Sequence, residues 1–289
     1  ANAYEKSVAA QVAASAASDL DDIPRAIAFL ERAIAENGLE NEAHYAAMQN
    51  LAVSQLNNEQ ADAAIATLQR LITETKTENA EIHYALAGAF LQAEQYPQGI
   101  EALKRAIGFA NPPKPEWKNL LMAAHLQADQ PAEAVKVGEA LLAQTPDDKR
   151  LVLNIASAYL DLEQTDRAIA LLEGARSRGL FTEARDYEML YALYFNAEGR
   201  EKDVIAVINE GLSKGLLKRD LRTLQALAQA AYFAEDMALS IATYQEAAAL
   251  DPKGDTGLNF AKVLSAEARD AEARDAAKAA LAKGVDNPG

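Results

Sequence analysis

The chain contains no cysteine and few aromatic residues, and each scarcity excludes a class of structure. Without cysteine there can be no disulfide and no thiolate metal site. Aromatic residues make up 6% of the 289 residues while 50% are hydrophobic. That balance fits tightly stacked helices better than a β-sandwich. No run approaches the roughly 18 apolar residues needed to cross a bilayer, so we expect no membrane insertion of this segment.

Basic residues are scarce relative to acidic ones. The chain has 28 Lys and Arg against 43 Asp and Glu, which gives a formal net charge of −15. This balance argues against a nucleic-acid partner, because little would neutralise the phosphates. An anionic membrane surface is disfavoured for the same reason. Acidity alone does not name a partner, since it commonly serves solubility.

Residues 149–180 hold two apolar stripes at helical spacing, separated by a polar elbow. The first stripe is Val152, Ile155, Ala156 and Tyr159, and the second is Ala168, Leu172 and Ala175. Each stripe follows the 3.6-residue period of one helix face. Gly179 is expected to end the second helix. Neither helix can bury its stripe alone, so each must pack on its partner and on a neighbouring pair.

The same unit recurs along the chain. A small residue opens the second helix of each unit, at Ala26, Ala64, Gly99, Ala134, Ala168, Val204, Ser240 and Ala273. Successive members of this column lie 33 to 38 residues apart. Such a fixed period predicts an array of repeats, in which each unit contacts only its neighbours.

These residues resemble the tetratricopeptide repeat, a helix–turn–helix unit of about 34 residues. The resemblance implies an all-α fold, a right-handed superhelix (α-solenoid) of about eight repeats. We expect a single solenoid over residues 1–289, with repeats at about 4–36, 40–76, 80–110, 115–145, 149–180, 183–214, 219–250 and 255–283. The prolines of residues 112–115 are interpreted as a rigid joint within it, because the repeat phase continues across them.

No arrangement of residues predicts an enzyme. There is no phosphate-binding loop and no nucleophile elbow. His44, His83 and His125 would have to converge from three repeats to bind a metal, and ordinary helix packing is the simpler explanation. The abundant carboxylates fit a solvated surface. We therefore predict no catalytic residue, no metal and no cofactor.

Amides on the first helices predict a binding groove. Asn50, Asn119, Asn154 and Asn259 fall at closely equivalent places beside the large–small pair. In related superhelical repeats, asparagines at this place line the concave groove and hydrogen-bond an extended peptide, since an amide both donates and accepts. Gln225 and Gln229 extend this polar lining, and Tyr84, Tyr232 and Phe233 supply side-chain pockets. The alternative is that all of these are ordinary solvated positions.

Three loop phrases carry a narrower likeness. They are residues 112–117 (Pro-Pro-x-x-Glu-Trp), 179–183 (Gly-Leu-x-Thr-Glu) and 287–289 (Asn-Pro-Gly). They resemble proteins of Gram-negative bacteria that accompany the ExbB/ExbD/TonB energy-transducing system, which implies a place in the envelope and support of import. A start at Ala1-Asn2-Ala3 fits an exported protein whose signal peptide is removed, or a fragment. We expect a periplasmic protein, with the cytoplasm as the alternative.

The function predicted from the sequence is a non-enzymatic scaffold that binds a partner peptide or protein segment in its concave groove. One alternative is an assembly subunit that docks through its convex face or a terminal repeat. Another is an accessory domain of an envelope-polysaccharide machine. The sequence does not predict the oligomeric state.

Overall fold

The computed structural model describes residues 1–285 as sixteen α-helices, with no strand in that range. This confirms the predicted all-α fold of about eight helix pairs. The chain divides into two compact units, unit 1 at residues 1–146 and unit 2 from Asp147 onward. The division does not fall at the proline-rich joint of residues 112–115, which lies inside unit 1. A single solenoid over the whole chain stays a prediction, and we describe each unit by itself.

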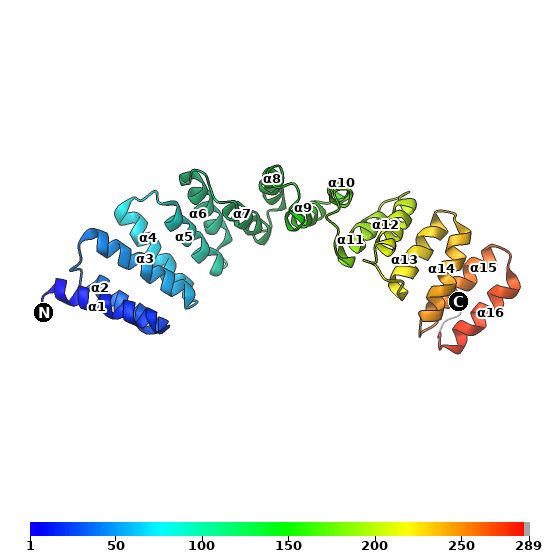
Figure 1. Ribbon diagram of the computed structural model, residues 1–289, viewed down its shortest axis with the longest axis horizontal. Coiled ribbons are helices and arrows are strands. Elements are labelled where there is room, and N and C mark those ends of the chain that lie inside the picture. The colour runs from blue at the N-terminus through cyan, green and yellow to red at the C-terminus, as the bar shows by residue number, and fades with distance from the viewer. Residues whose placement is uncertain (286–289) are drawn as a thin grey trace. The chain divides into compact units, whose positions relative to one another are not determined.

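Unit 1 contains four antiparallel helix pairs (Figure 1). Its helices are α1 (Ala3–Asp19), α2 (Ile23–Ala35), α3 (Asn41–Asn57), α4 (Ala61–Thr75), α5 (Ala80–Gln92), α6 (Tyr96–Phe109), α7 (Pro115–Gln127) and α8 (Pro131–Leu142). The first begins with a capping box, in which the Asn2 side chain accepts from the Glu5 amide and the Glu5 carboxylate accepts from the Asn2 amide.

Unit 2 also contains four pairs. Its helices are α9 (Lys149–Asp161), α10 (Thr165–Ser177), α11 (Ala184–Phe195), α12 (Glu201–Ser213), α13 (Leu221–Phe233), α14 (Met237–Leu250), α15 (Asp255–Ala266) and α16 (Asp270–Ala282). Gly179 follows the end of α10 with a φ of +78°, so it ends that helix as the sequence predicted.

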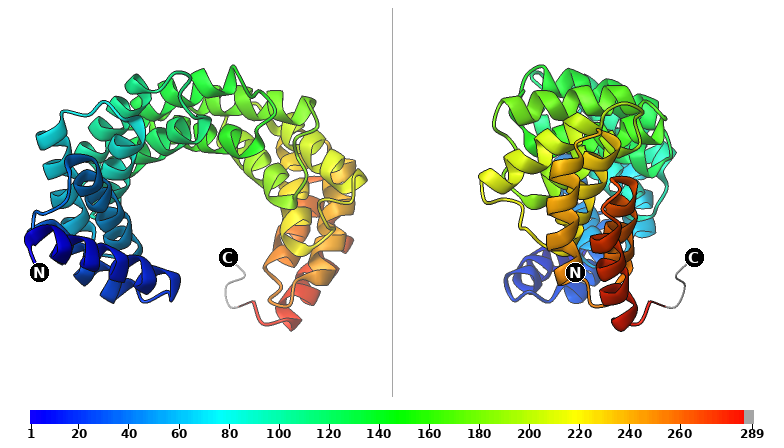
Figure 2. Two further views of the ribbon diagram at one scale, coloured as in Figure 1. Left: turned by 60° about the vertical axis from the view of Figure 1, so that its left-hand side comes forward. Right: turned by 90° about the vertical axis from the view of Figure 1, so that its right-hand side faces the viewer.

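Within each unit the helices form two layers (Figure 2). We call the surface of the odd-numbered helices the first-helix face and that of the even-numbered helices the second-helix face. The column of small residues is buried throughout. A Cβ atom added at Gly99 would lie 2.7 Å from Leu91, and Ser240 donates to the carbonyl of Ala228 across the pair. These residues therefore occupy the positions where two helices approach most closely.

The elbows between paired helices share an unusual backbone conformation. Six of them place an acidic residue at a φ between 55° and 60°. These residues are Asp21, Glu59, Glu94, Asp129, Glu163 and Glu235. Such left-handed values favour glycine, which is what the sixth repeat uses at Gly199. Each acid directly precedes the N-cap residue of the second helix, where the helix dipole favours negative charge.

The cores of the two units differ in composition. The largest fully buried side chains of unit 1 are aliphatic, namely Met48, Leu68, Leu71 and Leu103. Unit 2 buries two tyrosines of α11 just as completely, Tyr187 and Tyr194. The aromatic run of the sixth repeat, Tyr187, Tyr191 and Tyr194, therefore belongs to the core, where buried phenol hydroxyls need hydrogen-bond partners.

Candidate partner-binding sites

A pocket of about 310 Å³ opens on the first-helix face of unit 2, between α13, α14 and α15. We call it the α13–α15 pocket. Its lining consists of Gln229, Tyr232, Phe233, Tyr244, Asn259, Lys262 and Val263. Four of these, Gln229, Tyr232, Phe233 and Asn259, are among the residues that the sequence predicted for the groove. The structure thus brings together side chains from two neighbouring repeats.

Aromatic rings form one wall of the α13–α15 pocket. Tyr232 and Phe233 meet edge to face, with ring centroids 5.4 Å apart. Phe233 is 59% exposed, which is unusual for so large an apolar side chain. Tyr244 is buried, and burial raises the pKa of its phenol, so it stays neutral.

The polar groups of the α13–α15 pocket offer both hydrogen-bond donors and acceptors. Gln229, Asn259 and Lys262 are all exposed. Lys262 makes no ion pair with any residue of the described part of the chain. The pocket therefore combines an apolar wall, two primary amides and one unpaired cation, a set that can hold an apolar side chain together with its backbone.

A second pocket lies on the first-helix face of unit 1, between α1, α2 and α3, with a volume of about 650 Å³. We call it the α1–α3 pocket. It contains Asn50, another predicted groove residue. The exposed side chains of Val12 and Val53 flank it, and the rest of its polar lining is uncharged: Gln11, Ser15, Ser18, Ser54 and Asn57.

The other predicted groove residues lie outside these two pockets. Tyr84 is half-buried and stacks on Trp117, with centroids 5.0 Å apart and 16° between the rings. Asn154 is exposed and Asn119 is half-buried. Gln225 donates to the Thr256 hydroxyl at 2.6 Å, so its amide nitrogen already has a partner. The structure therefore places the predicted set at several separate sites along the first helices.

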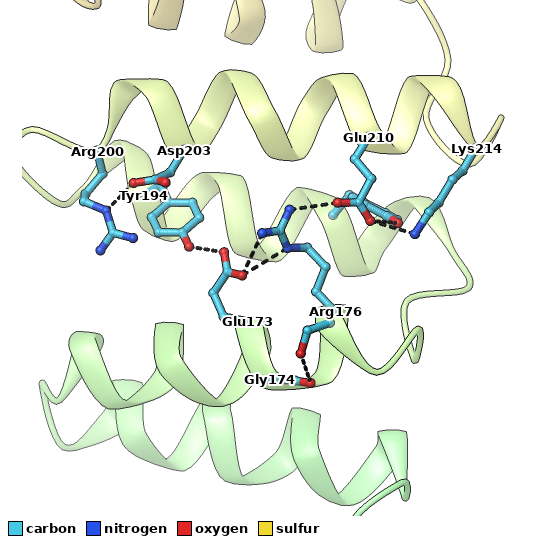
Figure 3. A network of polar contacts seen from close by, with 10 residues as sticks. Glu173, Gly174, Arg176, Tyr194, Arg200, Asp203, Glu210 and Lys214 are labelled. Carbon is cyan, nitrogen blue, oxygen red and sulfur yellow. Dashed lines mark hydrogen bonds and ion pairs between the residues drawn. The ribbon is translucent and has the colours of Figure 1, made fainter.

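A half-buried polar network connects α10, α11 and α12 in unit 2 (Figure 3). It was not predicted from the sequence. Arg176 contacts Glu173 at 2.7 Å and Glu210 at 2.8 Å. The phenol of Tyr194 donates to Glu173, and that of Tyr187 donates to Glu210 at 3.0 Å. We call these five residues the tyrosine–arginine network. Only the Glu173–Arg176 spacing of three residues is visible as a local pattern in the sequence, and it does not indicate the partners on α11 and α12.

Burial and hydrogen bonding shift the pKa values of several groups in the tyrosine–arginine network. Burial, together with the bond to Glu173, raises the pKa of the Tyr194 phenol far above its ordinary value. Burial alone would raise the pKa of the Glu210 carboxyl. Hydrogen bonds from Lys214 and Tyr187 and the charge of Arg176 outweigh burial and lower it. The two tyrosines stay neutral and Arg176 pairs with both carboxylates, so the network connects neighbouring repeats.

The three histidines are buried on separate helices, α3, α5 and α7. His83 Nε2 lies 3.0 Å from the Thr77 carbonyl oxygen, and His125 Nδ1 lies 2.8 Å from Gln130 Oε1. No cluster of three or more potential metal ligands occurs among residues 1–285.

Two protein-family models match parts of this chain. One tetratricopeptide repeat model matches residues 12–78, 50–115 and 84–149, and a second matches residues 125–192. Together the matches run from residue 12 to residue 192, which is more than half of the chain. The chain belongs to the tetratricopeptide repeat family.

Several solved structures share this fold. A chain in the structure of Naa15/Naa10 bound to HypK-THB aligns with 98% of this chain and 43% of its own length, at 15% identity and a TM-score of 0.67. The C-terminal part of a repeat protein from Cytophaga hutchinsonii aligns over 82% and 96%, at 16% identity and a TM-score of 0.57. A repeat protein from Parabacteroides merdae aligns over 85% and 93%, at 14% identity and a TM-score of 0.52. A comparison with curated proteins gives no match.

Tetratricopeptide repeats are generally protein–protein interaction scaffolds and typically non-catalytic, so membership indicates a protein partner. None of the helices within residues 1–285 is both long enough and apolar enough to cross a membrane. The fold thus supplies a series of similar helix faces, and the pockets show which parts of those faces are hollowed.

Proposed function

We propose that this tetratricopeptide repeat chain is a non-enzymatic scaffold that holds a segment of a protein partner on its first-helix face. The observation that carries the proposal is the α13–α15 pocket. There, exposed Phe233 lies beside two primary amides and an unpaired lysine. An exposed aromatic side chain in a concave setting is typical of a binding site.

The chemistry of the α13–α15 pocket favours a peptide segment. The amides of Gln229 and Asn259 can pair with main-chain N–H and C=O groups whatever the partner's sequence. The wall of Tyr232 and Phe233 can accept one apolar side chain. Lys262 favours an acidic group or a carboxylate nearby. In the α1–α3 pocket the lining is uncharged, so main-chain contacts would dominate there.

Photo-crosslinking in cells that produce the full chain tests the proposal. A photo-reactive amino acid in place of Phe233 should capture a discrete partner. The same amino acid in place of Leu250, which is similarly exposed at the end of a second helix, should not. Asn259→Ala should lower the captured yield about fivefold, as expected for one lost hydrogen bond. Equal capture at both positions, or none at Phe233, would contradict the proposal.

The finer identity, a component of a TonB-type transport system in the bacterial periplasm, is part of the same proposal. Loop phrases support it, and two of them lie in the described residues. Trp117 of the first is buried, and the amides of Thr182 and Glu183 in the second are held by Asp186. The third phrase, at residues 287–289, lies outside the described residues. Fractionation of cells that carry the intact gene tests the location, and recovery in the cytoplasm would reject it.

A further inference from the structure

The second-helix face of unit 1 has a hollow of about 610 Å³ between α4 and α6, with α5 beneath it. We call it the α4–α6 hollow. Its floor is buried and largely apolar, formed by His83, Leu86, Phe90 and Ala102. Its rim is exposed and largely polar, formed by Gln69, Thr73, Pro97, Gln98, Glu101 and Arg105. An apolar floor with a polar rim is the usual anatomy of a protein-binding site.

One small residue explains why the hollow is here. Ala102 lies three residues after the small residue that opens α6. At the same position, other second helices of the chain carry Phe29, Thr67, Val137, Leu171, Val207 and Thr243. Only Ala276 of the last repeat is equally small. Alanine therefore leaves open a space between neighbouring second helices that bulkier side chains can fill elsewhere.

The charges around the α4–α6 hollow favour a negatively charged occupant. Glu101 is already paired with Lys104 at 3.0 Å. Arg105 is exposed and makes no ion pair within residues 1–285. Arg105 shares its helix position with Arg70 of α4 and Arg32 of α2. Arg70 is already paired with Glu74 at 2.7 Å, so Arg105 is the cation on the rim that can pair with a carboxylate of the occupant.

The polar rim also favours a peptide over a small molecule. Gln69 on α4 and Gln98 on α6 border the hollow from its two sides. Each amide can both donate to and accept from a main chain that lies between the helices. An occupant that matches all of these features has a peptide backbone, one apolar side chain for the floor, and a carboxylate next to it for Arg105.

We propose that the α4–α6 hollow is a docking site for an acidic segment of a partner protein, which inserts one apolar side chain onto the Leu86–Phe90 floor and pairs a neighbouring carboxylate with Arg105. This site lies in a different unit and on a different face from the α13–α15 pocket. It does not depend on the function proposed above, and one chain could hold two partner segments.

Selection from a displayed random peptide library against the full chain tests the proposal. Enriched peptides should carry an apolar residue beside Asp or Glu. Their binding should fall more than tenfold in Ala102→Leu, which fills the hollow, and about fivefold in Arg105→Glu, which reverses one exposed ion pair. Arg32→Glu is the matched control, because it changes the same helix position away from the hollow and should leave binding unchanged.

Folding of the variants can be checked independently. Leu171 already occupies the position of Ala102 in α10, so Ala102→Leu should keep its helical circular dichroism. Arg105 is exposed, so Arg105→Glu remains informative even if the filling variant is unstable. Enrichment of basic peptides, no enrichment, or peptides that bind both variants normally would overturn the proposal. Loss of binding in Asn259→Ala but not in Ala102→Leu would instead assign the peptides to the α13–α15 pocket.

Discussion

Unit 1 and unit 2 share one repeat architecture but join their neighbouring repeats by different chemistry. In unit 1 the largest fully buried side chains are aliphatic, and most ion pairs join residues three or four positions apart, such as Arg70–Glu74 and Lys104–Glu101. Pairs of this kind, three or four residues apart, add a few tenths of a kcal/mol each. The pair Lys114–Glu81 connects two repeats, but both of its side chains are exposed. Apolar packing therefore dominates the contacts between repeats in unit 1, since an exposed ion pair contributes little.

In unit 2, ion pairs connect different repeats. Lys149 of α9 contacts Asp186 of α11 at 2.6 Å, and Asp186 is buried. Arg222 of α13 contacts Glu188 of α11 at 3.0 Å. The tyrosine–arginine network connects α10 to α12 in the same way. Partial burial makes such pairs matter more than surface pairs, because removing one partner leaves a charge without compensation.

One helix position shows the difference most directly. Six residues after the small opening residue, the first three second helices carry Arg32, Arg70 and Arg105. In unit 2 the same position holds Gly174, Glu210 and Glu246 before the last repeat. The residues of the small column must be small in every repeat for the helices to meet. The side chain at the nearby position can carry a positive or a negative charge. The comparison teaches that packing fixes the fold while adjacent charges decide how each unit responds to salt, pH and partners.

The largest expected effect should be common to both units. Leu103→Ala in α6 and Leu172→Ala in α10 remove the same fully buried side chain from equivalent positions. Each should cost about 2–5 kcal/mol of unfolding free energy, because the lost burial is compounded by a cavity. Urea unfolding with localised hydrogen exchange measures both. A large cost in only one unit would show that the two units do not depend equally on apolar packing at this position.

Removing an arginine should lower stability more in unit 2 than in unit 1. The side chain of Arg176 is 23% exposed and pairs with two carboxylates, so Arg176→Ala should cost roughly 2–3 kcal/mol, between the values for surface and buried pairs. Arg70→Ala in unit 1 is the matched control. Its pair with Glu74 is exposed and should contribute less than about 0.5 kcal/mol. Equal losses in the two variants would show that ion pairs contribute no more to unit 2 than to unit 1. Hydrogen exchange should localise the effect of Arg176→Ala to residues 165–214.

Acid should weaken unit 2 before unit 1. The pKa of Glu210 is lowered in the folded chain, despite burial, by Lys214, Tyr187 and Arg176. A lowered carboxyl pKa contributes stability that is fully present above the unfolded value of about 4.5 and is lost as the pH falls through the folded value. Exchange protection in α10 to α12 should therefore decline below about pH 4.5. The loss should be smaller than that from removing Arg176, since protonated Glu210 can still accept hydrogen bonds.

Glu210→Gln supplies the control for the acid prediction. The amide keeps the shape but cannot titrate, so the variant should be less stable at pH 7 and should show a flatter pH profile in α10 to α12. In unit 1 the exposed Glu133 also has a lowered pKa, through its bond to Lys136, but solvent screens that pair. An unchanged profile in Glu210→Gln would show that other groups carry the acid sensitivity.

The repeat architecture could be predicted from the sequence because it depends on a period. A small residue every 33 to 38 positions and the flanking apolar stripes require no knowledge of which repeats touch. The division after Pro146 was not predicted, because the repeat phase continues through it as it does through the proline-rich joint at residues 112–115. Prolines interrupt a helix, but they do not determine how well the helices on either side pack.

The candidate sites were less predictable for a related reason. Helical phase places Asn50 and Asn259 on a first-helix face, but it does not say whether the neighbouring side chains leave a hollow. The α4–α6 hollow depends on Ala102 being smaller than the residue at the same position of most other second helices. In an alanine-rich chain, a single alanine does not indicate a hollow. The tyrosine–arginine network depends on partners 21 to 34 residues apart, which a local pattern does not reveal.

The smallest expected effect concerns the elbows and should again be equal in both units. Glu94 and Glu163 adopt a φ of 57°, a left-handed conformation that costs an L-residue about 1–2 kcal/mol. Glycine relieves this cost but loses the favourable charge at the helix N-terminus and adds freedom to the unfolded chain, each worth roughly 0.5–1 kcal/mol. Glu94→Gly and Glu163→Gly should therefore change stability by no more than about 0.5 kcal/mol. Gly199→Glu is the reverse test, since an added Cβ there meets nothing within 4 Å. A loss well above that size at Gly199 alone would show that its elbow is constrained by more than the shared turn geometry.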